Sequence, residues 1–225
     1  MQRRQMLKLL GGGMLGGGLT GLCGPGAAAT ACGGYPAGDR WAFDVLRHDA
    51  VIGDHVFTFS RGTASRDTAP RDAGDFVVEV AIDITVGFLG VTLFRFTHRA
   101  EEIWRGGLLQ ALTSETDDDG TLWQVRYERQ GDNLRGSVNG APAEGPGDIL
   151  PASLWHPDTP RATRLLDTVD GGIKPVAAVV LAPPPAGHFR LTGGIEREVW
   201  TDAACGLTRV VFPARDGSLI TLARR

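Results

Sequence analysis

Hydrophobic and polar residues alternate along most of the chain, and the clearest alternation lies near its middle. Over residues 76–86 an apolar side chain occupies every second position, and residues 91–99 alternate in the same way. Because successive side chains of a strand point to opposite faces, a period of two predicts strands. A short turn bounded by Gly87 and Gly90 separates the two segments. They therefore predict a long antiparallel hairpin at the centre of the fold.

Similar but shorter alternating segments occur before and after this hairpin, with glycine-rich or acidic turns between them. They span residues 41–46, 51–60, 101–104, 108–116, 122–129, 134–138, 173–181, 188–191, 195–201, 207–212 and 218–223. Strands repeated at intervals of about 8–12 residues are typical of all-β sandwiches, barrels and curved sheets. We therefore predict an all-β fold, a strongly curved antiparallel sheet or open barrel of ten to twelve strands.

The segment from 141 to 172 interrupts this rhythm. It contains five prolines and Trp155, and Pro lacks the N–H that a strand ladder needs. We predict a long connection here, with one short helical segment near 152–169. Trp155, in a loop, could cover one side of the sheet as a lid.

The first 31 residues have the composition of an export signal. Arg3 and Arg4 are followed by Leu7-Lys8, a glycine-rich apolar run and a small-residue site that predicts cleavage after Ala31. The pattern resembles a twin-arginine signal, which implies passage of a folded chain through the twin-arginine export machinery. The apolar run is too short and glycine-rich to span a membrane well, since a span needs about 20 apolar residues. We therefore predict a periplasmic or secreted protein without a stable membrane span in its mature chain.

Cleavage would leave a linker at 32–40 and a single β-domain at 41–225. It would remove three of the 23 basic residues and none of the 26 acidic ones, leaving a formal charge of −6. That balance argues against nucleic acid and anionic membrane surfaces as partners. Of the three cysteines, Cys32 and Cys205 would remain. An oxidising compartment permits a disulfide between them, although free thiols or a lipid anchor on Cys32 stay as alternatives.

A set of short pieces, in a fixed order, resembles an uncharacterised family of exported bacterial β-proteins known only as a domain of unknown function. The pieces are Phe43-Asp44-Val45-Leu46, Ile52-Gly53, Glu102, Trp104, Leu112, Ser114, Thr116, Gly120, Trp155, Gly194, Trp200, Asp202, Gly206, Phe212 and Asp216-Gly217-Ser218. The resemblance implies a curved antiparallel sheet or open barrel, similar to periplasmic lipoprotein carriers. It implies no activity and no catalytic residue.

Residue clusters that could support catalysis or metal binding are few. His98 with Glu101 and Glu102 is the tightest His/carboxylate group, but no second histidine stands at ligand spacing. The run 117–120 has Leu122 at the position where a calcium loop needs Gly, which favours an acidic hairpin turn. No nucleophile elbow is present in the sequence, and its glycine runs lie in the signal segment and in hairpin turns rather than between a predicted strand and a helix, as a phosphate-binding pattern requires. We therefore predict no catalytic residue, metal or cofactor.

The aromatic residues are the remaining candidates for a binding site. Rings on alternating positions most simply form a core. They could also line a groove for an apolar molecule, and the candidate ligand-binding residues are then Trp104, Trp123, Trp155, Phe94 and Phe96. The sequence leaves three functions open: a non-enzymatic carrier of a lipophilic ligand, an envelope protein-interaction module with a filled core, and a cofactor-dependent enzyme.

Overall fold

The computed structural model describes residues 39–61, 75–183 and 186–225, and their strands belong to one sheet of 15. The strands of the first half are β1 (Arg40–Arg47), β2 (Ala50–Arg61), β3 (Phe76–Phe88), β4 (Val91–Arg105), β5 (Leu108–Asp118), β6 (Thr121–Gln130), β7 (Asn133–Val138) and β8 (Ala141–Pro146). Those of the second half are β9 (Leu150–Pro151), β10 (Arg164–Leu166), β11 (Ile173–Ala182), β12 (His188–Gly193), β13 (Arg197–Thr201), β14 (Leu207–Pro213) and β15 (Leu219–Arg224).

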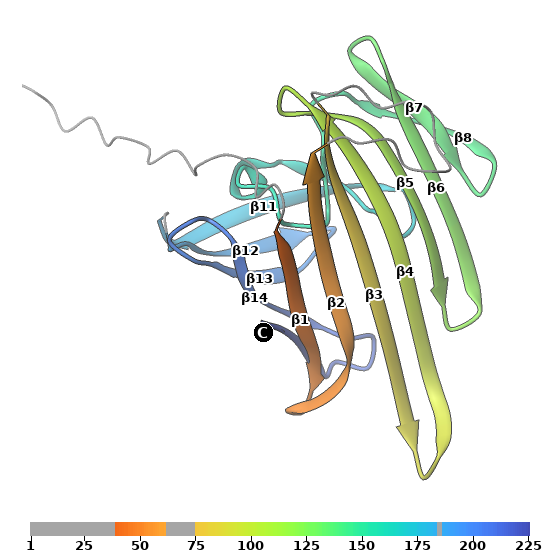
Figure 1. Cartoon of the computed structure of the whole chain (residues 1–225), viewed down its shortest axis with the longest axis vertical. Helices are drawn as coiled ribbons and strands as arrows, with labels where there is room; N and C mark the ends of the chain where they lie inside the picture. The colour runs from red at the N-terminus through yellow and green to blue at the C-terminus, as the bar shows by residue number, and fades with distance from the viewer. Residues whose placement is uncertain (1–38, 62–74, 184–185) are drawn as a thin grey trace, which may run out of the picture.

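The sheet is two meanders joined by the pairing of β1 with β15. Its order runs from β8 back to β1 and then from β15 back to β9, so β8 and β9 are its two edges. Every pair is antiparallel except β9 with β10. Figure 1 shows β11–β14 at a steep angle to β1–β6 and passing behind β1 and β2, so the sheet curls over its own inner face. The all-β prediction is confirmed, with 15 strands where ten to twelve were expected.

The alternation of side chains along each strand decides which of them face the interior of the curled sheet. In β1 the buried positions are Trp41, Phe43 and Val45, and in β2 they include Phe57 and Phe59. Trp41 packs edge to face on Phe59, with centroids 4.6 Å apart, while Phe57 and Phe59 stack on each other. Burial of each such ring stabilises the fold by roughly 1.5–3 kcal/mol. Aromatic side chains therefore fill one end of the interior.

The 141–172 segment differs from its prediction. It contains the strands β8, β9 and β10 where a long connection was expected, and the short helical segment expected near 152–169 is a 3-10 turn at Thr159–Arg161. β8 carries two prolines, which is tolerated because an edge strand has one side without a ladder partner. The residues that follow the 3-10 turn pair with β11 as β10.

Several sequence predictions concern residues outside the described part of the chain. They are the export signal at 1–31 with its cleavage after Ala31, nearly all of the linker at 32–40, and Cys32. Among the described residues, no helix combines the length and apolarity that a membrane crossing requires.

Candidate functional site

An apolar cavity of about 580 Å³ lies inside the curl, beside the aromatic core. Its size falls within the roughly 300–1,000 Å³ that is usual for small-molecule sites. Aliphatic and aromatic side chains from both halves of the sheet form most of its wall. They are Ile52 of β2; Val80, Ile82, Ile84 and Val86 of β3; Phe94 and Phe96 of β4; Ile195; Leu207, Val210 and Phe212 of β14; and Ile220 and Leu222 of β15.

Strand register explains where the core ends and the cavity begins. His55, Ile82, His98 and Thr116 are paired in turn across β2, β3, β4 and β5, so they form one row on the inner face. On the core side of this row the neighbouring strands contribute Phe57, Phe59 and other rings that fill the space. On the other side β3 and β4 continue past the row with Ile84, Val86, Phe96 and Phe94, and these side chains line the cavity instead of filling it.

His98 is a fully bonded member of this row. Its Nδ1 lies 2.8 Å from Thr116 Oγ1, and its Nε2 lies 3.3 Å from Thr168 Oγ1. Burial lowers its pKa to about 4, and the positive charge of Arg99 acts in the same direction. His98 is therefore neutral at pH 7, and the two hydroxyls hold its ring at the cavity wall.

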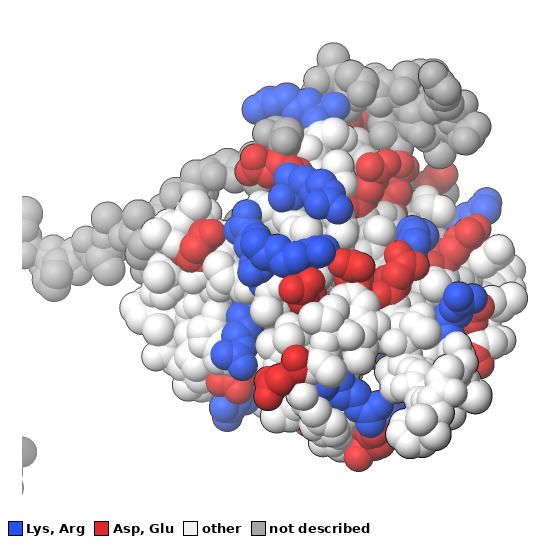
Figure 2. All heavy atoms as spheres, turned by 60° about the horizontal axis from the view of Figure 1, so that its bottom comes forward, with Lys and Arg blue, Asp and Glu red and all other residues white. Residues whose placement is uncertain are grey.

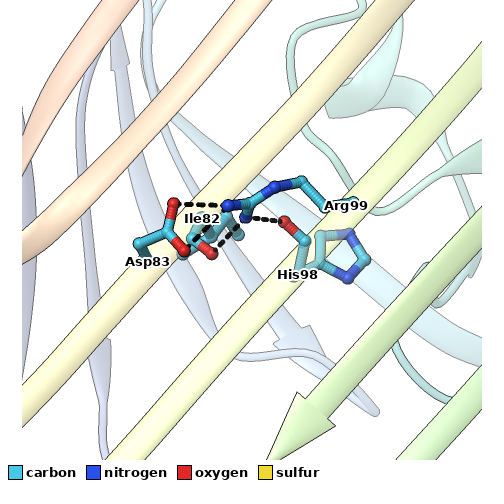
Figure 3. A network of polar contacts seen from close by, with 4 residues as sticks. All are labelled: Ile82, Asp83, His98 and Arg99. Carbon is cyan, nitrogen blue, oxygen red and sulfur yellow. Dashed lines mark hydrogen bonds and ion pairs between the residues drawn. The ribbon is translucent and has the colours of Figure 1, made fainter.

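On the outer face of the sheet, Arg99 holds the backbones of β3 and β4 together beside His98. Arg99 donates to both carboxylate oxygens of Asp83, at 2.8 and 2.7 Å, and to the carbonyls of Ile82 and His98, each at 2.9 Å. Figure 3 shows this network on the side of the strands away from the His98 ring. Arg99 thereby joins β3 to β4 directly behind two cavity-lining residues.

His55 differs from His98 because one of its nitrogens has no partner. The residue is 8% exposed and lines the cavity. Its ring stacks on Phe57 with centroids 4.5 Å apart, while Nε2 is buried without a hydrogen bond. Burial lowers its pKa to about 3, with a smaller contribution from His98. The alternation in β2 places His55 on the face of Phe57 and Phe59, yet no sequence motif singles it out.

The charged residues of the wall balance one another. Three arginines and three aspartates line the cavity, so its formal charge is zero while both histidines are neutral. Arg47 pairs with Asp216, and Arg215 pairs with Asp118. The guanidinium of Arg197 lies 4.2 Å from the centre of the Phe212 ring and donates to the Glu196 carbonyl at 2.8 Å. Asp167, the sixth charged residue of the wall, accepts from the Val169 N–H at 2.9 Å.

The five aromatic residues that were candidates from sequence separate in the structure. Phe94 and Phe96 line the cavity. Trp104 and Trp155 are buried in the core instead, with ring centroids 5.3 Å apart, and both donate to Glu102 Oε2, at 3.0 and 2.8 Å. Trp155 is thus part of the core rather than a lid.

The wall beside Trp155 comes from the residues that precede it. Ala152, Ser153 and Leu154 line the cavity, although Trp155 itself does not. Trp123 is paired with Thr116 and so continues the row of His98, but it also lies outside the cavity wall. The cavity therefore uses none of the three tryptophans that the sequence suggested.

The β3–β4 hairpin extends beyond its neighbours at the lower end of Figure 1. Residues 84–94 carry no charged side chain. Figure 2, with this end of the molecule turned forward, shows acidic and basic residues interspersed over the surrounding surface. Four apolar side chains of the hairpin are exposed: Phe88 by 66%, Leu89 by 86%, Val91 by 61% and Leu93 by 62%. Val86 and Phe94, next along the two strands, line the cavity, so the exposed apolar tip lies beside the cavity wall.

The structure shows what the acidic run 117–120 and Cys205 form. Asp119 and Gly120 have positive φ angles of 53° and 91°, and Asp117 accepts from the Gly120 N–H at 2.7 Å, which makes the acidic run a tight hairpin turn. Within the described ranges, no three His, Cys, Asp or Glu side chains gather as metal ligands would. Cys205 is disulfide-bonded. Its pairing with Cys32 stays a prediction, because Cys32 lies outside the described residues.

Comparison with known proteins adds the fold relationship and the family. Among curated proteins, none matches the chain. The crystal structure of a β-barrel-like protein of the domain of unknown function DUF1849 from Brucella abortus is similar, with a TM-score of 0.56 at 8% identity. The match covers 83% of this chain and 94% of that one, and at this identity it shows a shared fold alone. The model of another domain of unknown function, DUF6134, matches residues 43–225, and the chain therefore belongs to the DUF6134 family.

Proposed function

We propose that this protein is a non-enzymatic binding protein that holds a lipophilic molecule in the cavity between β3–β4 and β14–β15. The observation that carries the proposal is the 580 Å³ cavity itself, because its wall is built mainly from Val, Ile, Leu and Phe side chains. Water in such a space makes few hydrogen bonds, so an apolar ligand that displaces it gains free energy roughly in proportion to the area it buries.

The β3–β4 hairpin favours a carrier that exchanges its lipophilic ligand over a protein that holds the ligand permanently. Its exposed apolar tip adjoins Val86 and Phe94 of the cavity wall. Exposed apolar groups beside a cavity give a lipophilic molecule a path with little contact with water. Export to the periplasm or beyond, which the N-terminal sequence predicts, would place such a carrier in the cell envelope. The ligand exchange would then take place with an apolar donor or acceptor there.

The test is the binding of N-phenyl-1-naphthylamine, an uncharged dye that fluoresces in apolar surroundings. Wild-type protein should bind it with saturable 1:1 stoichiometry. Ile84→Trp, which fills the cavity from β3, should reduce the affinity at least tenfold. Val179→Trp is the matched control, because Val179 is 54% exposed and does not line the cavity.

The two variants separate cavity binding from surface binding. An unchanged affinity in folded Ile84→Trp would place the dye elsewhere, and absence of saturable binding to the wild type would refute the proposal. Circular dichroism of both variants shows whether each has folded. Native mass spectrometry of protein purified without detergent then asks whether a molecule is already bound and gives its mass.

A further inference from the structure

We infer that the cavity contains a hydrogen-bonding subsite at His55 that selects an uncharged amphipathic ligand with a hydroxyl head group. This inference rests on the proposed function, since it specifies the class of ligand that the same cavity takes. Its starting point is His55 Nε2, a buried nitrogen without a hydrogen-bond partner in the wall of an apolar cavity. An unsatisfied buried polar group costs roughly as much free energy as a lost hydrogen bond. A ligand that supplies the missing hydrogen bond to Nε2 therefore gains that free energy on binding.

The surroundings of His55 do not supply that partner. Its ring is held between the stack on Phe57 and the contact with Phe43, whose centroid lies 6.1 Å away. Across the strand ladder its neighbour is Ile82, which has no polar side-chain atom. His98, one strand further, uses both ring nitrogens on Thr116 and Thr168. No described protein group therefore bonds His55 Nε2, and a ligand reaches this nitrogen from the cavity that His55 lines, once a small movement of the wall uncovers it.

The protonation state of His55 indicates which head group fits. With its pKa at about 3, the ring is neutral at pH 7, so Nε2 is a donor in one tautomer and an acceptor in the other. A hydroxyl both donates and accepts and satisfies either tautomer, whereas a carbonyl satisfies only one. An ammonium head group would bring an uncompensated charge into apolar surroundings, which is costly.

The charge balance of the wall argues against a carboxylate head group. Arg47 and Arg215 already pair with Asp216 and Asp118. Arg197 is offset by Asp167 and lies over the Phe212 ring. A carboxylate would therefore give the cavity a net negative charge, which is costly in apolar surroundings. The ligand class that remains is a long-chain alcohol or another neutral lipid with a free hydroxyl.

The experiment compares three dodecyl compounds, dodecane, 1-dodecanol and dodecanoate, as competitors of the naphthylamine dye at pH 7.5. In the wild type, dodecanol should bind more tightly than the other two after correction for their aqueous solubilities. In His55→Phe the ratio of dodecanol to dodecane affinities should fall about fivefold, as expected for one hydrogen bond. Because the same compounds are used with both proteins, solubility cancels in that change.

Ile82→Val is the matched control, since Ile82 lies between the two histidines and has no hydrogen-bonding atom. It should change the affinities for dodecane and dodecanol by the same factor. A ratio that falls equally in Ile82→Val and His55→Phe would overturn the subsite. So would tighter binding of dodecanoate than dodecanol that disappears in Arg197→Gln, because it would identify a carboxylate site instead.

A measurement on the wild type keeps the inference testable even where His55→Phe fails to fold. The ¹⁵N NMR signal of His55 Nε2 should shift when dodecanol is added and stay unchanged with dodecane. Equal shifts with both compounds, or none with dodecanol, would refute the subsite. If no dodecyl compound and no dye binds, the proposed function itself fails. Binding without the His55 effect contradicts only this inference.

Discussion

At the scale of single residues, burial on the inner face of the sheet favours the neutral forms of His55 and His98. Burial keeps the pKa of His55 at about 3 and that of His98 at about 4, below the ordinary value of 6.5. The unfolded chain therefore binds more protons than the folded one between these values, and folding stability is lost as the pH falls below 6.5.

This linkage predicts a pH dependence that His55→Phe reduces. For each histidine the loss approaches about 1.4 kcal/mol per pH unit below 6.5, until its folded pKa is reached. His55→Phe should keep the stack on Phe57, remove the orphan nitrogen and flatten the curve of unfolding free energy between pH 6.5 and 4. Urea unfolding at a series of pH values measures it. His188→Phe is the control, because His188 is only partly buried and lies outside the cavity wall. Parallel curves for wild type and His55→Phe would contradict the prediction.

The contribution of Glu102 to folding stability should depend on pH in the opposite direction. Burial raises its pKa against the hydrogen bonds of Ser153, Trp155 and Trp104, so the folded state favours the protonated carboxyl. Its contribution to stability is present below about 4.5 and is lost as the pH rises through the folded pKa. Glu102→Gln keeps an acceptor for both indoles without this titration. Relative to wild type, it should gain stability as the pH rises from 4 to 8.

Replacement of Glu102 by Leu separates charge from hydrogen bonding. This variant leaves the Nε1–H groups of Trp104 and Trp155 without their acceptor, and each orphaned buried donor costs about 1–3 kcal/mol. Chemical unfolding at pH 7 should therefore show a loss of several kcal/mol in Glu102→Leu and a much smaller change in Glu102→Gln. Equal losses in the two variants would mean that the indoles do not depend on this acceptor.

At the scale of elements, the close contact between β2 and β3 leaves no room for a side chain at Gly53. A Cβ at Gly53 would lie 2.0 Å from the Asp83 carbonyl oxygen of β3, closer than any real contact. Gly53→Ala must therefore separate the two strands and should cost about 1–3 kcal/mol of stability. Val51→Ala in the same strand, at a side chain that is 61% exposed, should cost less than about 0.5 kcal/mol. Thermal unfolding compares the two, and equal effects would show that β2 tolerates the larger residue.

The elements also show how far sequence reasoning extends. The period-two alternation predicted β1 to β7 closely, because one face of each strand is buried. It missed β8, since Pro142 and Pro146 read as a loop and only the edge position permits them. The sequence leaves Trp155 open between core and lid because its segment does not alternate, and the structure places its indole against the buried carboxyl of Glu102.

The cavity could be predicted only in part. Phe94 and Phe96 belong to the central hairpin and were candidates from the sequence, and both line it. Their partners across the cavity, such as Phe212 and Ile220, lie more than 100 residues away in the chain. They face the hairpin only because β1 pairs with β15, a long-range contact that no local pattern encodes.

At the scale of the whole molecule, Cys205 predicts a covalent tie to the N-terminal part of the chain. It is disulfide-bonded, and after the predicted cleavage Cys32 is the other cysteine of the sequence. Disulfides that close long loops typically stabilise proteins by about 2–5 kcal/mol. Cys32→Ser in the exported protein should therefore expose one reactive thiol and lower the unfolding free energy by that order. Thiol titration with and without reductant checks it, and an unreactive Cys205 in this variant would exclude the pairing.

The two meanders also meet through charges beside the cavity. The turn between β14 and β15 contributes Pro213 to Asp216 to the cavity wall. From this turn Arg215 reaches Asp118 at the end of β5, which lies five strands away along the sheet, and Asp216 pairs with Arg47 at the end of β1. The Arg215–Asp118 pair therefore connects parts of the curled sheet that share no ladder, whereas the Asp216–Arg47 pair adds to the contact between the neighbours β15 and β1. Because the Arg215 side chain is 79% exposed, the Arg215–Asp118 pair is open to solvent at one end and contributes on the order of 1 kcal/mol, which holds the turn across the cavity without locking it.

This arrangement predicts an effect on ligand exchange rather than on folding. Asp118→Asn should raise the dissociation rate of the naphthylamine dye by up to about fivefold and change the unfolding free energy by less than about 1 kcal/mol. Salt screens exposed charges, so the wild-type rate should rise toward that of the variant as the ionic strength increases, while the variant responds little. Asp148→Asn, which breaks the ion pair with Arg164 away from the cavity wall, is the control and should leave the rate unchanged. Stopped-flow dilution measures all three proteins. If Asp118→Asn releases the dye at the wild-type rate at low salt, the turn does not limit exchange, and the ligand must leave along the β3–β4 hairpin instead.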